Sequence, residues 1–164
     1  MEIEKAPVLK ALKKNVLFSN NSEAFLIKML YCGEIIDCSA NEMIVEEGSE
    51  GDIIFFILNG TCAVSKRGDS GQDIYITTLD EGKHFGEAGV FVDGPRTANV
   101  KSLQDVQLLS LNKNQMNQII DTNPSEGIIF LKKIIQENFI RLRDTTRELR
   151  LDRRPTIDNI LAQI

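Results

Sequence analysis

The feature that most constrains the fold is a succession of short runs rich in β-branched and aromatic residues between Ile35 and Leu111. Turn signals containing glycine, asparagine, aspartate or proline separate these runs. Many short strands at such spacing are typical of an antiparallel barrel or sandwich. Asn59-Gly60, between two runs, predicts a tight β-hairpin. We expect strands within six runs: 43–45, 53–58, 62–65, 74–79, 98–101 and 106–111.

Helical patterns flank this β region on both sides. Before it, apolar residues at helical spacing predict one helix over about residues 8–16. Ser22 and Gly33 are placed to begin and end a second helix. After the β region, Pro124 lies in the first turn of a long helical pattern that reaches about Arg150. The predicted order is therefore helices, a β-barrel, and helices again.

The long C-terminal helix carries an apolar stripe at heptad spacing. Its a and d positions are Ile128, Leu131, Ile135, Asn138, Leu142, Thr145 and Leu149. A stripe of this kind suits a seam between helices, which would make a homodimer through residues 128–149. It equally suits packing of the helix on the chain's own barrel, because a single amphipathic stripe does not identify its partner. Both interpretations stay open at this point.

Residues 85–100 carry the chemistry. They combine a turn of predicted helix with flanking glycines, inside a region that is otherwise β. A helix N-terminus exposes free N–H groups, and Gly86 lets a ligand approach the backbone closely. The guanidinium of Arg96 suits a phosphate, whereas Glu87 needs a hydrogen-bond donor, which a ribose hydroxyl supplies. Phosphate and ribose together indicate a nucleotide.

The pattern Phe-Gly-Glu-Ala-Gly…Pro-Arg-Thr-Ala in this segment resembles the phosphate-binding cassette of cyclic nucleotide-binding domains. That family includes the bacterial catabolite activator and the regulatory subunit of cyclic-AMP-dependent protein kinase. Leu17-Phe18-Ser19, Gly48, Gly51-Asp52 and residues 57–60 extend the resemblance over roughly residues 10–150. It implies an α+β fold, namely a jelly-roll-like antiparallel β-barrel with N-terminal helices and a long C-terminal helix.

The resemblance also implies roles for individual residues. Glu87 would accept the ribose 2′-hydroxyl, and Arg96 would hold the cyclic phosphate with help from backbone N–H groups. The long helix would cover the base, through Thr145 and Thr146 if three residues are inserted before them, or otherwise through the positions of Arg141 and Leu142. Thr97 is compatible with either cyclic AMP or cyclic GMP. The candidate ligand-binding residues are Phe85, Gly86, Glu87, Ala88, Arg96, Thr97, Ala98, Arg141, Thr145 and Thr146.

Composition narrows the remaining possibilities. The 164 residues carry a formal net charge of −5, which disfavours a role in coating nucleic acid. Three cysteines without a Cys-x-x-Cys pair and a single histidine, His84, predict no metal site, and His84 suits a strand surface.

No signal peptide or membrane-spanning run is evident, so we expect a cytoplasmic protein. The chain ends without room for a helix-turn-helix domain, so we expect no DNA binding, and it shows none of the common catalytic motifs, so we expect no enzyme activity.

We therefore divide the chain into four parts: N-terminal helices over residues 1–34, a barrel over 35–111 with its cassette at 85–98, lid or dimerisation helices over 112–150, and a tail over 151–164. The expected function is that of a sensor for cyclic AMP or cyclic GMP, with no other cofactor, whose ligand repositions the C-terminal helix. One alternative is a self-associating structural module with a vestigial nucleotide site. Another is a subunit that recruits a separate effector protein through its acidic surface or residues 153–164.

Overall fold

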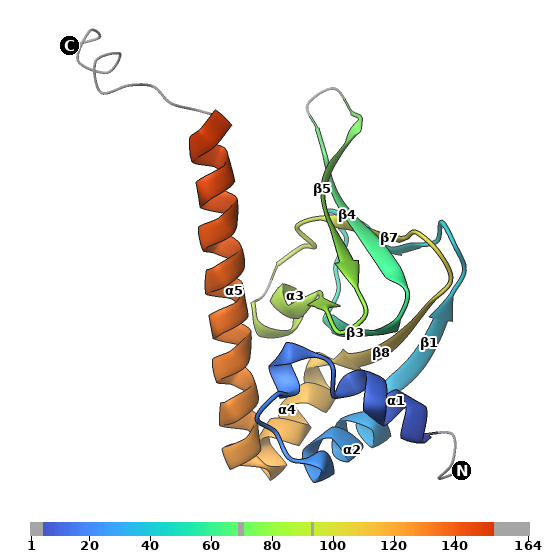
Figure 1. Ribbon diagram of the computed structural model, residues 1–164, viewed down its shortest axis with the longest axis vertical. Helices are drawn as coiled ribbons and strands as arrows, with labels where there is room; N and C mark the ends of the chain where they lie inside the picture. Colours follow the sequence, from blue (N-terminus) through green and yellow to red (C-terminus); the bar gives the residue numbers. More distant parts are fainter. Residues whose placement is uncertain (1–4, 69–70, 93, 153–164) are drawn as a thin grey trace, which may run out of the picture.

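The computed structural model describes residues 5–68, 71–92 and 94–152, with side chains described between residues 6 and 144. Two four-stranded antiparallel sheets form the centre, with strand orders β1-β8-β3-β6 and β2-β7-β4-β5. The N-terminal helices and α4 lie at one end of the barrel, and α5 runs along its side (Figure 1). The expected α+β fold, a jelly-roll-like antiparallel barrel with N-terminal helices and a long C-terminal helix, is confirmed.

All six expected β runs form strands, and two short strands, β1 and β6, join them. The strands are β1 (Glu34–Cys38), β2 (Met43–Val45), β3 (Ile53–Asn59), β4 (Thr61–Arg67), β5 (Asp73–Asp80), β6 (His84–Phe85), β7 (Asn99–Ser102) and β8 (Val106–Asn112). The helices are α1 (Lys5–Leu12), the 3₁₀ turn η1 (Val16–Phe18), α2 (Glu23–Cys32), α3 (Glu87–Phe91), α4 (Lys113–Thr122) and α5 (Pro124–Asp152).

The hairpin expected at Asn59-Gly60 is wrong. β3 pairs with β6 and β8 in one sheet, whereas β4 pairs with β5 and β7 in the other. Gly60 has a φ of 93°, so the chain does turn sharply here. The turn carries the chain from one sheet to the other. A short-range turn signal cannot distinguish a hairpin from such a corner, because the partner strands are distant in sequence.

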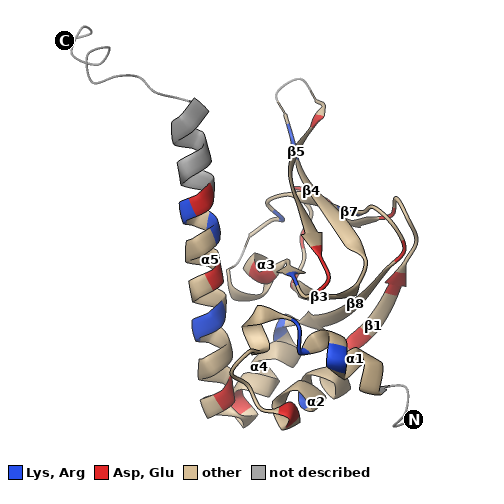
Figure 2. Ribbon diagram, in the orientation of Figure 1, with Lys and Arg blue, Asp and Glu red and all other residues tan. Residues whose placement is uncertain are grey.

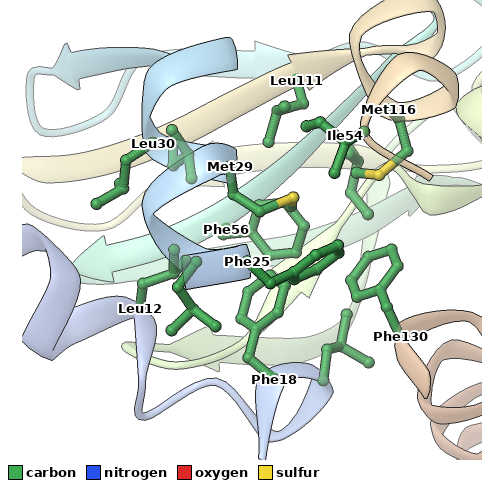
Figure 3. Packing of buried hydrophobic residues seen from close by; sticks show 14 of the residues in the cluster. Leu12, Phe18, Phe25, Met29, Leu30, Ile54, Phe56, Leu111, Met116 and Phe130 are labelled. Atoms are coloured by element: carbon green, nitrogen blue, oxygen red, sulfur yellow. The ribbon is translucent and has the colours of Figure 1, made fainter. Parts of the chain in front are cut away.

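β3 supplies both hydrophobic cores. Side chains alternate across a strand, so Ile54, Phe56 and Leu58 face the helices and join the larger core. Phe55 and Ile57 face the opposite sheet and join the core inside the barrel. Figure 3 shows the larger core, in which Phe18, Phe56 and Phe130 come together from η1, β3 and α5. The rings of Phe18 and Phe130 stack with their centroids 5.4 Å apart.

α5 attaches to the rest of the chain by a face that the heptad positions do not include. Phe130 and Ile134 are buried against the larger core. The heptad residues Ile128, Ile135 and Leu142 are 52%, 54% and 62% exposed. The interpretation in which the heptad stripe packs on the chain's own barrel is therefore wrong for these residues. The helix turns Phe130 and Ile134 inward and leaves Ile128, Ile135 and Leu142 outward.

His84 is buried, in contrast to the expected surface position. The ring is 1% exposed, in β6, and lies near Phe56 with the ring centroids 6.5 Å apart. Burial, reinforced by the positive charges of Arg141 and Lys83, lowers the pKa of His84 to about 3. Nδ1 has no hydrogen-bond partner among the described residues. The imidazole is therefore neutral in the folded state at neutral pH.

This burial makes stability depend on pH. The unfolded chain binds a proton at His84 below about pH 6.5, while the folded chain stays neutral down to far lower pH. The contribution of His84 to the free energy of unfolding is therefore fully present above this pH and is lost as the pH falls. At pH 5 the loss from His84 is about 2 kcal/mol. We expect the His84→Asn variant to lose this part of the pH dependence in urea unfolding measured at pH 7.5 and 5.0.

The direct control is an NMR titration. Because His84 is the chain's single histidine, its ring resonances are assigned without ambiguity. They should not titrate between pH 7.5 and 5.0 in the folded protein. A midpoint near 6.5 would contradict the burial argument.

Candidate functional site

The cassette backbone is fixed from two sides. β6 pairs with β3, and Phe85 stacks on Phe55 with a centroid distance of 5.0 Å inside the barrel core. Val90, in the middle of α3, is 2% exposed and belongs to the larger core. Between these anchors Gly86 caps α3 in the left-handed conformation, with a φ of 81°. The first N–H groups of α3 lie beside this cap and have no acceptor within the helix.

Arg96 lies against the cassette and is only 8% exposed. Its Nη1 donates to the carbonyl of Gly86 at 3.2 Å, and its Nη2 donates to the carbonyl of Ile53 at 2.9 Å. Burial lowers the pKa of Arg96, while the charges of Asp52 and Glu87 act in the opposite direction. A guanidinium stays charged even so, which makes this a buried cation held by backbone oxygens.

The main chain of Arg96 is held as firmly as its side chain. Its N–H donates to the carbonyl of Ser49 at 2.8 Å, and its carbonyl accepts from the N–H of Gly48 at 2.8 Å. These two bonds join the cassette to the turn between β2 and β3. That turn therefore fixes the position of the Arg96 backbone. The residue spacing within the cassette does not predict this contact.

Glu87 faces α5. Its carboxylate forms an ion pair with Nη1 of Arg141 at 3.0 Å, and its side chain is 16% exposed. Nη2 of Arg141 also donates to the carbonyl of His84 at 3.1 Å and lies 3.4 Å from Nε2 of the same residue. Figure 2 shows acidic α3 beside α5, which carries both basic and acidic residues. The guanidinium of Arg141 thus ties α5 to both sides of Gly86.

The structure brings several of the candidate residues together. Gly86, Glu87, Arg96 and Arg141 meet around the start of α3, and Phe85 lies in the barrel core behind them. Ala88 and Thr97 are exposed, and Ala98 is half-buried. Thr145 and Thr146 belong to the described backbone of α5, but their side chains lie outside the described residues.

Four further residues, not predicted from the sequence, contribute to the site: Ser49, Gly51, Ile53 and His84. The first three hold or surround Arg96, and the last binds Arg141. Gly51 was already part of the pattern that resembles the family. The other three act through backbone carbonyls, which any residue type provides.

A second feature lies away from the cassette. A cavity of about 370 Å³ is lined by Asp37, Cys38, Ser39, Asn59, Asp105, Val106 and Gln107. β3 extends from Ile53, which binds Arg96 of the cassette, to Asn59, which lines this cavity. Within the described ranges no group of three or more histidine, cysteine or acidic residues could hold a metal ion. No helix in the described part of the chain is long and apolar enough to cross a membrane.

Comparison with known proteins gives relatives of two kinds, transcriptional regulators and regulatory subunits of a protein kinase. The chain is 29% identical over 111 residues to the "cAMP-activated global transcriptional regulator CRP" of Haemophilus influenzae, covering 67% of this chain and 48% of that protein. It is 35% identical over 79 residues to the "cAMP-dependent protein kinase regulatory subunit" of Debaryomyces hansenii, covering 48% of this chain and 17% of that one. The chain spans about half the length of the bacterial regulators that it matches.

Solved structures agree on the fold. A cyclic nucleotide-binding domain from Methylobacillus flagellatus superimposes with a TM-score of 0.81 at 19% identity, covering 94% of this chain and 87% of that one. The profile of the cyclic nucleotide-binding domain matches residues 35–123, which include every strand of the second sheet and the whole cassette. This match extends over more than half of the chain, and the chain therefore belongs to the cyclic nucleotide-binding domain family.

Proposed function

We propose that this chain is a regulatory domain that binds cyclic AMP or cyclic GMP at the cassette. Arg96 holds the cyclic phosphate together with the N–H groups of Gly86, Glu87 and Ala88 and those near Thr97 and Ala98. Glu87 accepts the ribose 2′-hydroxyl. The domain acts by binding and not by catalysis, as its regulatory relatives suggest.

The observation that carries this proposal is the buried guanidinium of Arg96 beside the capped start of α3. Two of its donors bind the carbonyls of Gly86 and Ile53. A guanidinium has five N–H donors in a planar fork, so this one keeps capacity for a phosphate oxygen. The neighbouring N–H groups of α3 supply further donors for the same anion.

The proposed test titrates the protein with cyclic AMP and cyclic GMP by calorimetry. We expect the Arg96→Ala variant to weaken binding by about 2–5 kcal/mol, roughly 30-fold to several thousand-fold in Kd, because a buried charge-assisted contact is lost. Arg67→Ala is the matched control, since it removes the same charge from an exposed arginine whose ion pair is 3.9 Å long. No heat from either nucleotide with folded wild-type protein would favour the alternative of a vestigial site.

For regulation, we propose that α5 responds to the ligand through Arg141. Glu87, the proposed acceptor of the ribose hydroxyl, is the same carboxylate that binds Arg141. A ribose at Glu87 changes the environment of that ion pair and thereby the free energy of docking α5 on the cassette. A ligand shifts such an equilibrium only by its difference in affinity for the two positions of the helix.

The Arg141→Ala variant tests this coupling. We expect the nucleotide to change the hydrogen exchange of α5 amides in the wild-type protein, and this change to disappear in Arg141→Ala, because the contact between α5 and Glu87 is gone. Arg143→Ala should behave as wild type, since Arg143 is 74% exposed and pairs with Asp144 at 3.5 Å. An unchanged response in Arg141→Ala would show that α5 senses the ligand by another route.

We also propose that the outer stripe of α5 pairs with a second copy of the chain. Ile128, Ile135, Phe139 and Leu142 lie on one side of the helix and are all at least 52% exposed. An apolar stripe of this length on one helix favours a symmetric helix pair, because each copy presents the same surface to the other.

The Phe139→Glu variant should shift a dimer to a monomer in sedimentation experiments, because a carboxylate in an apolar helix pair is costly. Gln136→Glu is the matched control: it adds the same charge at an exposed position of the same helix that is not apolar. A wild-type protein that is monomeric with and without nucleotide would overturn the proposal of a homodimer. Effector binding through residues 153–164 lies outside the described residues and stays a prediction.

A further inference from the structure

Three glycines surround the guanidinium of Arg96. A Cβ atom placed on Gly51 would lie 2.6 Å from Nε and 2.7 Å from Nη2 of Arg96. A Cβ on Gly89 would lie 2.8 Å from Nη1, and one on Gly86 would lie 2.9 Å from the same atom. We call Gly51, Gly86 and Gly89 the glycine socket. They come from the β2–β3 turn, the cap of α3 and α3 itself, so the socket exists only in the folded chain.

The three glycines are required for different reasons. Gly86 has a φ of 81°, which favours glycine whatever surrounds it. A Cβ on Gly89 would collide with the carbonyl of Gly51, which belongs to the backbone. Gly51 has no such constraint, because the three atoms nearest to its Cβ position are Nε, Nη2 and Cζ of Arg96. The atoms nearest to the space that Gly51 leaves are therefore those of the Arg96 guanidinium.

We propose that Gly51 is a positioning residue for Arg96. Its missing side chain lets the guanidinium lie close to the β2–β3 turn, within reach of the carbonyls of Ile53 and Gly86. The same turn holds the main chain of Arg96 through Ser49 and Gly48. The turn thus positions both the backbone and the guanidinium of Arg96. It thereby determines where the cation would contact an anionic ligand. The assignment deepens the proposed function and rests on it for its consequence in binding.

A methyl group at position 51 would not need to disturb the backbone, because the colliding atoms are the far end of a flexible side chain. The guanidinium would move instead and would leave one or both carbonyl acceptors. A planar fork binds a phosphate oxygen only from a narrow range of directions. A displaced guanidinium therefore binds the phosphate less well even though its charge is retained.

The experiment measures affinity and stability in parallel on full-length variants. We expect Gly51→Ala to weaken binding of the better-bound of cyclic AMP and cyclic GMP by about tenfold or more in calorimetry, the equivalent of one charge-assisted hydrogen bond. Glu50→Gln is the matched control from the same turn. The Glu50 side chain is exposed and is not one of the groups that hold Arg96, so binding should stay within about twofold.

Urea unfolding without nucleotide tests the steric part alone. Gly51→Ala should lower the urea midpoint in the wild-type background but not in the Arg96→Ala background, where the colliding atoms are absent. Gly89→Ala should lower it in both backgrounds, because its collision with the carbonyl of Gly51 persists. If the wild-type protein bound no nucleotide, the proposed function would fail, while this cycle would still decide whether Gly51 positions Arg96.

Two results would overturn the assignment. One is a Gly51→Ala protein that binds the nucleotide as tightly as wild type. The other is a loss of stability from Gly51→Ala that is equal in both backgrounds, since this would show a role in the turn that is independent of the arginine.

Discussion

The site depends on one interaction: the burial of the Arg96 guanidinium among backbone carbonyls. Taking a cation out of water is costly unless its donors are bonded. The carbonyls of Gly86 and Ile53 provide that bonding, and the carbonyl of Ser49 and the N–H of Gly48 hold the main chain. These groups belong to three parts of the fold: the cap of α3, the start of β3 and the β2–β3 turn. The cassette, the β2–β3 turn and β3 must therefore all be in place before the cation is satisfied.

β3 links this site to the rest of the molecule. Its first residue, Ile53, bonds Arg96, while its next residues alternate between the two hydrophobic cores. Its neighbour β6 leads directly into Gly86 and α3. Because both cores pack against the same strand, the cassette is attached to a strand with five buried residues. Precise placement of binding groups on a rigid element is the arrangement that a tight anion site requires.

The contact between Glu87 and Arg141 gives the site its connection to α5. Phe130 and Ile134 fix the first turns of α5 in the larger core, whereas farther along the helix Arg141 holds it through an ion pair with a partly exposed guanidinium. Ion pairs that reach solvent contribute little stability. The helix is therefore firmly packed near its start and weakly held beside the cassette, where the proposed ligand would contact Glu87.

The sequence by itself determined the order of elements, the six main strands, the caps at Ser22 and Gly33, and the residues of the cassette, because these follow from local periodicity, turn chemistry and a local motif. It did not determine that Asn59-Gly60 is a corner between sheets, that His84 is buried, or which stripe of α5 faces inward. Those outcomes, like the joining of Gly51, Ser49 and Ile53 to Arg96, depend on contacts between segments far apart in the chain. Only the tertiary structure decides them, since the free energy of burial is set by what packs on the other side.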